Sequence, residues 1–230
     1  MISDSIEARI KAVRRGIDEA CIGAGRAPSS VRLLAASKTQ PADVIREALS
    51  AGHTLLGENR AQSLRDKAPV LASHDPSPEW HFIGRLQKNK IKYVVPWATL
   101  IHTVDSLALA QAIAQRSPHP IGVLVQVNVG DDPAKGGVSS TDALQLCEQI
   151  DTLTGIELRG LMTMPPATQS PQEASPFFQA LADLAARGRD KGLPTHELSM
   201  GMTSDFPYAV AEGATIIRVG TAIFGPRGPQ

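Results

Sequence analysis

The chain opens with one helical pattern and then alternates between short apolar runs and helical stretches. Ile6, Ile10, Val13 and Ile17 recur at three- and four-residue spacing, which predicts an amphipathic helix within residues 3–24. The apolar runs that follow predict strands, several of them apolar almost throughout, as expected for parallel strands covered on both faces. The predicted strands are residues 32–37, 53–57, 80–84, 100–104, 122–129, 157–164, 197–200 and 215–219.

Helical stretches separate these strands along the whole chain. They are residues 42–51, 59–67, 86–95, 106–116, 140–152, 173–191 and 205–212. Eight strand–helix units predict an α/β fold, a single (β/α)8 TIM barrel with an extra N-terminal helix, and no linker divides residues 1–230 into domains. A doubly wound sheet also alternates, but it needs a phosphate loop after an early strand, and no G-x-G-x-x-G or Walker sequence occurs there.

Composition and charge narrow the class of protein. The 230 residues hold 23 Lys plus Arg and 23 Asp plus Glu, so no net field attracts nucleic acid or acidic lipid. Cys21 and Cys147 do not form a disulfide framework pattern, and the histidines lack metal-ligand spacing. The N-terminus does not resemble a signal peptide, and no apolar run approaches the roughly 20 residues of a membrane span. We therefore expect a cytoplasmic protein with no metal, nucleic-acid or membrane partner.

Lys38 is the first candidate for chemistry, because it ends the first predicted strand. In a TIM barrel the working face lies at the C-terminal ends of the strands, and phosphate commonly binds after the seventh and eighth. Glycine-bearing segments, residues 200–205 and 220–225, follow those two strands. An amine beside a phosphate site indicates a Schiff base with a phosphorylated aldehyde, for which pyridoxal 5'-phosphate (PLP) and a sugar phosphate are the candidates.

Arg218 is the second candidate, because it falls inside the apolar eighth strand, two residues before Gly220. A guanidinium that points into a barrel needs a partner, since burying it unpaired is costly. One possible partner is an internal carboxylate such as Glu58. The other is a ring nitrogen of a bound cofactor, which an arginine would keep unprotonated.

Five segments together resemble the pyridoxal phosphate homeostasis protein family, in the same order and over residues 5–227. They are Ala36-Ser37-Lys38-Thr39, Gly57-Glu58-Asn59, residues 81–90, Ser199-Met200-Gly201-Met202 and residues 218–225. The resemblance implies a fold-type III barrel like the N-terminal domain of alanine racemase. It also implies that this protein binds PLP and serves vitamin B6 homeostasis.

The resemblance also implies a role for each matching residue. Lys38 would be the aldimine lysine, and Arg218 would face the pyridine nitrogen. The phosphate would lie on Ser199, Thr203, Gly220 and Thr221. Asn59 and Met164 would lie along the cofactor, with His81 nearby. Apart from the resemblance, the lack of ligand spacing indicates that His81 is a polar residue of the rim rather than a metal ligand.

Three positions depart from the family pattern. Thr203 stands where the family usually has serine, a change that preserves the hydroxyl. Arg60 stands where an aromatic residue is common, and Lys135 keeps the family's lysine among altered neighbours. The roles of Arg60 and Lys135 stay open.

Two classes of function compete for this site. Racemisation needs acid–base groups on both faces of the bound substrate, and Lys38 serves one face. In enzymes like alanine racemase a tyrosine from a separate domain of the partner subunit serves the other. Five residues follow Gly225, so we do not expect that domain, and Tyr93 and Tyr208 fall in helices outside the barrel.

We therefore expect a monomeric protein that holds PLP without robust turnover rather than an enzyme. PLP-dependent apo-enzymes would be its recipients. A PLP-dependent amino-acid racemase is the alternative, and a Schiff-base aldolase acting on a sugar phosphate ranks third.

Overall fold

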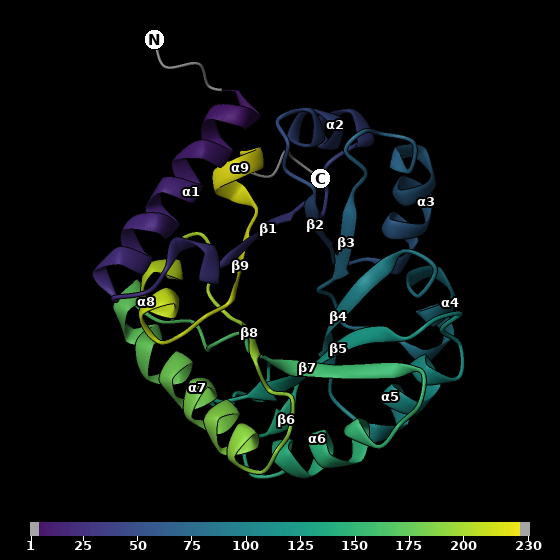
Figure 1. Cartoon of the computed structure of the whole chain (residues 1–230), viewed down its shortest axis with the longest axis vertical. Coiled ribbons are helices and arrows are strands. Elements are labelled where there is room, and N and C mark those ends of the chain that lie inside the picture. The colour runs from purple at the N-terminus through teal and green to yellow at the C-terminus, as the bar shows by residue number, and fades with distance from the viewer. Residues whose placement is uncertain (1–4, 226–230) are drawn as a thin grey trace.

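Parallel strands close into a barrel with helices around its outside (Figure 1). The computed structural model describes residues 5–225. The barrel strands are β1 (Arg32–Ala36), β2 (Leu55–Glu58), β3 (Glu79–Phe82), β4 (Ala98–Val104), β5 (Ile121–Asn128), β7 (Ile156–Met162), β8 (Glu197–Ser199) and β9 (Ile216–Val219). They lie in the order β4-β3-β2-β1-β9-β8-β7-β5, and pairing of β4 with β5 closes the ring. The prediction of a TIM barrel is confirmed.

The helices lie on the outside of the barrel (Figure 1). They are α1 (Ile6–Gly23), α2 (Ala42–Ser50), α3 (Ala61–Leu71), α4 (Ile91–Val94), α5 (Leu107–Ala114), α6 (Ala143–Asp151), α7 (Ser175–Asp190), α8 (Phe206–Ala211) and α9 (Thr221–Phe224), with 3-10 turns η1 (Pro28–Ser30), η2 (Lys88–Lys90) and η3 (Pro171–Ala174). The helix predicted over residues 86–95 is instead η2 followed by the single turn α4, and Pro96 prevents its extension. A short strand that the apolar pattern did not indicate, β6 (Val138–Ser139), pairs with β5.

The extra N-terminal helix is present as α1. The Ser5 hydroxyl caps it by accepting a hydrogen bond from the Ala8 N–H at 3.2 Å. Its four periodic isoleucine and valine positions are buried, as the spacing predicts. The helix packs against α8 and α9, so it covers the part of the barrel beside β1 and β9.

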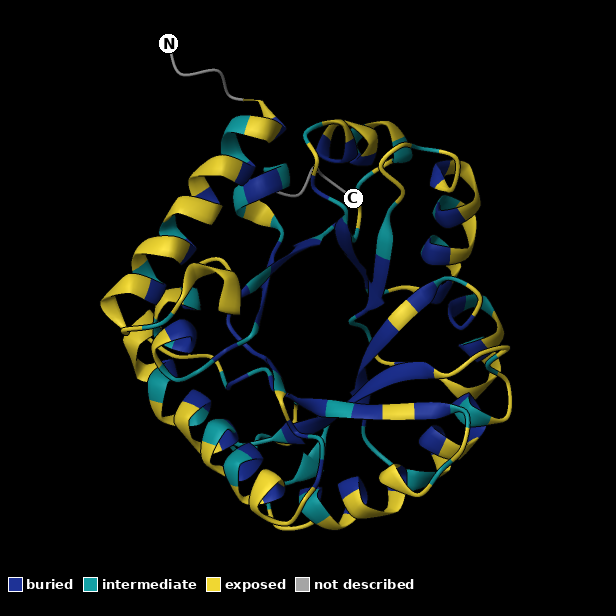
Figure 2. Ribbon diagram, in the orientation of Figure 1, coloured by how far each residue is buried: buried dark blue, intermediate teal, exposed yellow. Residues whose placement is uncertain are grey.

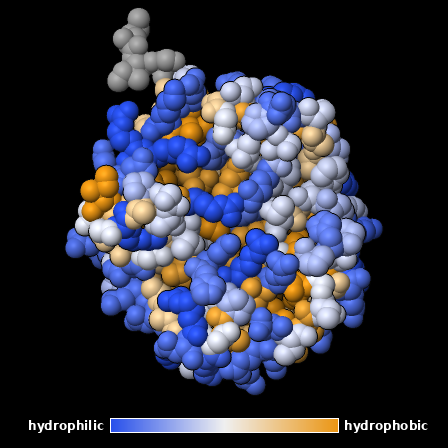
Figure 3. Space-filling view, in the orientation of Figure 1, coloured by the Kyte–Doolittle hydropathy of each residue, from blue (hydrophilic) through white to orange (hydrophobic). Residues whose placement is uncertain are grey.

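Two apolar clusters form the core, and the smaller one lies inside the barrel. It consists of Leu34, Leu55, Leu100, Leu124, Met162 and Ile216. The larger cluster lies between the strands and the inner faces of the helices, whose outer faces are exposed (Figure 2). Side chains fill the centre of the barrel, and hydrophilic ones cover much of it in the space-filling view (Figure 3). The barrel is thus a packed core rather than a channel.

The pairing of β1 with β9 decides where the candidate residues meet. Leu34 lies beside Arg218 and Ala35 beside Val219 in this parallel register. Lys38 therefore follows the end of β1 next to the loop that begins at Gly220. The predicted adjacency of the first and last strands is confirmed.

Other expectations concern features that the described residues do not show. No helix within residues 5–225 is long and apolar enough to cross a membrane. The same part of the chain has no cluster of three or more histidine, cysteine or acidic side chains that could hold a metal. Cys21 and Cys147 are buried free thiols, consistent with their apolar surroundings.

Candidate cofactor site

A cavity of about 620 Å³ lies at the C-terminal ends of the strands. Most of the site residues predicted from the sequence line it: Lys38, Asn59, Met164, Thr203, Arg218, Gly220 and Thr221. They come from the ends of β1, β2, β7, β8 and β9 or from the loops that follow. The fold thus gathers around one cavity residues that lie more than 180 positions apart in the sequence.

Lys38 lines the cavity from a tight turn at the end of β1. The Gln40 N–H donates to the Ser37 carbonyl at 3.0 Å, and Thr39 adopts a φ of 113°, which a β-branched residue rarely does. Such a conformation costs about 1–3 kcal/mol and persists only where its surroundings enforce it. The strained turn therefore fixes the backbone from which the Lys38 side chain lines the cavity.

An ion pair between Lys67 and Glu58 holds Ser37, the residue just before Lys38. Lys67 of α3 donates from Nζ to Glu58 Oε1 at 2.5 Å and to the Ser37 carbonyl at 3.2 Å. Glu58 is fully buried, and its Oε1 also accepts from the Ser37 hydroxyl at 3.3 Å. Because Glu58 pairs with Lys67, it is not the partner of Arg218, and that alternative is wrong.

Two loops supply hydroxyls and backbone N–H groups to the cavity. After β8, Gly201 has a φ of 89°, and a Cβ there would lie 2.6 Å from the Ala209 Cβ, so a side chain is excluded. After β9, the first helical hydrogen bonds of α9 run from Ile223 N and Phe224 N to the Gly220 carbonyl. The N–H groups of the first helical residues precede these bonds and have no intrahelical acceptor. Hydroxyls and N–H groups of this kind suit a phosphate.

Arg218 is buried at the floor of the cavity and bonds only to neutral oxygens among the described residues. Its Nη1 donates to Ser199 Oγ at 2.7 Å and its Nη2 to the Thr163 carbonyl at 3.0 Å. Burial lowers the pKa of Arg218 to about 10, while the Asp205 carboxylate acts to raise it, so the guanidinium stays charged at neutral pH. A cation without a carboxylate partner therefore faces the cavity.

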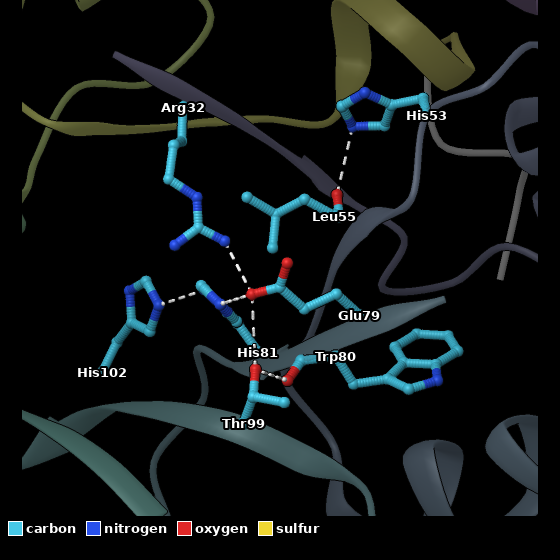
Figure 4. A network of polar contacts seen from close by, with 8 residues as sticks. All are labelled: Arg32, His53, Leu55, Glu79, Trp80, His81, Thr99 and His102. Atoms are coloured by element: carbon cyan, nitrogen blue, oxygen red, sulfur yellow. Dashed lines mark hydrogen bonds and ion pairs between the residues drawn. The ribbon is translucent and has the colours of Figure 1, made fainter. Parts of the chain in front are cut away.

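Ser199 and His81 do not line the cavity, although the resemblance places both near the cofactor. Ser199 is fully buried below Arg218, and its hydroxyl bonds to Arg218 and to Nδ1 of His102 at 2.8 Å. His81 is 1% exposed and lies between Glu79 and His102 (Figure 4). The interpretation of His81 as a rim residue is wrong, because the alternation along β3 points its side chain into the barrel.

Several lining residues were not singled out in the sequence. Arg85, Thr103, Asp105 and Gln126 lie at or just after the C-terminal ends of β3, β4 and β5. Their position at strand ends was the available signal, but no motif marked them. Arg60 and Lys135 do not line the cavity, whereas Ala134 and Gly136, the neighbours of Lys135, do.

Comparison with known proteins decides the family. Residues 24–228 match the family model of the alanine racemase N-terminal domain. The chain belongs to this family. Within it, a pyridoxal phosphate homeostasis protein of Aquifex aeolicus is 42% identical over 223 residues, covering 95% of this chain and 97% of the relative. A Deinococcus radiodurans protein of the same name is 43% identical over 219 residues, covering 94% and 99%. The resemblance to the pyridoxal phosphate homeostasis proteins is confirmed.

Solved structures agree with the fold. PipY of Synechococcus elongatus PCC7942, in a structure with PLP bound, superposes with a TM-score of 0.84 at 36% identity. The match covers 96% of this chain and all of that one. PipY thus binds PLP on a barrel of the same fold.

Proposed function

We propose that this protein binds PLP in its cavity and serves PLP homeostasis by holding the cofactor without robust turnover. The observation that carries the proposal is that Lys38 and Arg218 line the same cavity of about 620 Å³. PLP supplies an aldehyde that condenses with a lysine amine with loss of water, together with a pyridine nitrogen and a phosphate. The amine, the cation and the two loops offer a partner for each of these groups.

Each lining residue that was predicted from the sequence has a defined task in this proposal. Lys38 would hold the aldehyde carbon, and the Arg218 guanidinium would donate to the pyridine nitrogen. Thr203, Gly220 and Thr221 would hold the phosphate through hydroxyls and backbone N–H groups. Asn59 and Met164, which also line the cavity, would lie along the ring.

The donor chemistry of Arg218 would limit turnover on a bound cofactor. An arginine has no proton to release at neutral pH and no acceptor atom, so it can only donate to the pyridine nitrogen. A ring nitrogen that stays unprotonated is a weaker electron sink. Arg218 would therefore limit carbanion chemistry on the bound cofactor.

The remaining titratable groups of the cavity offer a racemase one candidate for its second acid–base group. Within the described residues the titratable side chains that line it are Lys38, Arg85, Asp105 and Arg218. Tyr93 in α4 and Tyr208 in α8 do not line it. A racemase would need a second acid–base group opposite Lys38, and Asp105 is the one carboxylate in this described set.

We further propose that the protein acts in the cytoplasm as a monomer and passes PLP to PLP-dependent apo-enzymes.

Deuterium exchange separates the holding function from racemisation. The purified protein should take up PLP and gain a visible absorption band that Lys38→Ala lacks and the distant exposed variant Lys191→Ala keeps. The loaded protein is then incubated in deuterated water with single amino-acid enantiomers. The Cα hydrogen of the amino acid should exchange for deuterium no faster than it does with free PLP. Fast exchange with inversion of the enantiomer would contradict the holding function and support the racemase. A protein that takes up no PLP would contradict both.

A further inference from the structure

A chain of polar side chains crosses the interior of the barrel beneath Arg218. Arg218 Nη1 bonds to Ser199 Oγ at 2.7 Å, and Ser199 Oγ bonds to His102 Nδ1 at 2.8 Å. His102 Nε2 bonds to His81 Nδ1 at 2.9 Å, and His81 Nε2 to Glu79 Oε1 at 3.1 Å (Figure 4). We call these five residues the buried chain. It is unusual for a TIM barrel, whose interior layers are mostly apolar.

The two ends of the buried chain give it a direction. A carboxylate only accepts hydrogen bonds, so His81 Nε2 carries a proton and donates to Glu79. The neutral His81 ring then accepts at Nδ1 from His102 Nε2–H. His102 in turn accepts at Nδ1 from the Ser199 hydroxyl. With its proton committed to His102, the Ser199 oxygen is an acceptor for Arg218, which only donates.

The charge state of the two rings agrees with this direction. Burial lowers the pKa of His81 and lowers that of His102 well below its ordinary value. The hydrogen bond from His81 is the main cause that lowers the pKa of Glu79 to about 2. The other charged groups that act on the two rings are the guanidinium groups of Arg32, Arg159 and Arg218. Both rings are therefore neutral, and Glu79 is ionised, at neutral pH.

We propose that Ser199, His102 and His81 are positioning residues that hold Arg218 in the orientation needed for the cofactor. In the reverse direction, Ser199 Oγ would accept from both His102 Nδ1–H and Arg218, and its own buried hydroxyl proton would have no acceptor among the hydrogen bonds of the described residues. The inferred direction gives that proton an acceptor, so Ser199 and the Thr163 carbonyl orient the guanidinium, and its other N–H groups serve the cavity. This role rests on the proposed function, because it is PLP that Arg218 would contact.

The far end of the buried chain lies at the opposite mouth of the barrel. The Glu79 side chain is 40% exposed, pairs with Arg32, and lines a second cavity of about 450 Å³ at the N-terminal ends of the strands. A substitution at Glu79 can therefore alter the buried chain from the end of the barrel opposite the proposed PLP site.

Histidine NMR of the unliganded protein tests the direction without any cofactor. In ¹⁵N-histidine-labelled protein at neutral pH, His81 and His102 should both be neutral rings that carry the proton on Nε2. Glu79→Gln should yield a mixture of ring tautomers, because an amide can donate as well as accept. Glu157→Gln, which removes an exposed carboxylate of β7 that pairs with Arg159, should leave both rings unchanged. A wild-type Nδ1–H tautomer, or a Glu79→Gln spectrum like wild type, would overturn the proposal.

PLP affinity tests the positioning itself. His102→Leu should weaken PLP binding about tenfold and shift the absorption of the bound cofactor, whereas His102→Gln should stay within about threefold of wild type. The carboxamide of glutamine can accept and donate as the ring does. Leu100→Ala, a buried change on the same inner face of β4, should lower stability without this loss of affinity. Equal effects of His102→Leu and Leu100→Ala would reduce the histidine to a packing role.

The two proposals fail in different ways. A wild-type protein that takes up no PLP contradicts the proposed function, and the ring tautomers then decide the direction of the buried chain alone. If His102→Leu does not fold, the affinity of Glu79→Gln compared with Glu157→Gln decides the positioning role. Unchanged affinity in Glu79→Gln would contradict it.

Discussion

Arg32 and Arg218 occupy inner positions on neighbouring strands, yet the fold satisfies them differently. Arg32, at the N-terminal end of β1, donates to the Glu79 carboxylate at 2.6 Å, and both side chains are 40% exposed. Arg218, at the cavity end of β9, is 5% exposed and bonds only to neutral oxygens among the described residues. Burying a cation without a carboxylate is costly. The arginine without a bonded carboxylate therefore lies at the end of the barrel where we propose that PLP binds, and the arginine paired with Glu79 lies at the other end.

The charge pair behind the cavity gives the largest expected effect. Lys67→Met removes the partner of Glu58, which is fully buried, and leaves an uncompensated carboxylate. The free energy of unfolding should fall by about 3–5 kcal/mol, measured by urea denaturation. The double variant Glu58→Gln/Lys67→Met should recover much of the loss, because the buried charge is gone. A loss below about 1 kcal/mol would contradict this reasoning.

Acid should weaken the structure through buried neutral histidines. Burial, reinforced by the Arg14 guanidinium 3.0 Å from Nδ1, lowers the pKa of His53 to about 4. Burial also lowers the pKa values of His81 and His102. The unfolded chain takes up protons near pH 6.5 and the folded protein does not, so stability should fall as the pH falls below about 6.5.

His53 separates its own part of this acid effect. Between pH 7 and pH 4 the free energy of unfolding should fall by on the order of 3 kcal/mol from His53 alone. His53→Gln, which can keep the bonds to Arg14 and to the Leu55 carbonyl, should lose less stability over this range. An unfolding free energy that rises on acidification would refute the assignment.

Removing each of the two arginines in turn tests the comparison itself. Arg218→Leu should weaken PLP binding by about 10–100-fold, because a hydrogen bond from a charged donor is lost. Arg32→Leu reaches the cavity only through Glu79, so affinity should change at most about threefold and stability by about 1 kcal/mol. Titration with PLP and urea denaturation measure the two quantities. Equal losses of affinity would remove the distinction between the two ends.

The smallest effect concerns the turn that carries Lys38. Thr39→Gly should relieve the strain of a φ of 113° and raise the free energy of unfolding by up to about 1 kcal/mol, after the entropy cost of glycine. Thermal unfolding measures this change. A decrease would show that the Thr39 side chain stabilises the turn by more than its backbone strain costs.

The fold and the outline of the cavity could be predicted because they depend on local patterns. Alternating apolar runs and helices specify a barrel, and a barrel brings the ends of the first and last strands together. Their order along the sequence is therefore enough to predict that Lys38, Arg218 and Gly220 line one cavity, and no side-chain contact has to be known.

The errors in the predicted site arise from side-chain direction and from tertiary pairing. The resemblance implies that Ser199 holds the phosphate, whereas the alternation of β8 points its hydroxyl beneath Arg218. Glu58 was a candidate partner of Arg218, but α3 brings Lys67 to it. His81 and His102 lie 21 positions apart and have no ligand spacing, and only the pairing of β3 with β4 brings them together.

The position of the covalent bond to PLP tests the central claim most directly. The protein is loaded with PLP, reduced with borohydride, digested, and its peptides are weighed by mass spectrometry. The phosphopyridoxyl mass should lie on Lys38 and on no other lysine, and Lys38→Ala should carry none. A label on Lys67 or Lys135, or one spread over exposed lysines with Lys38 unmodified, would contradict the assignment of this cavity as the PLP site.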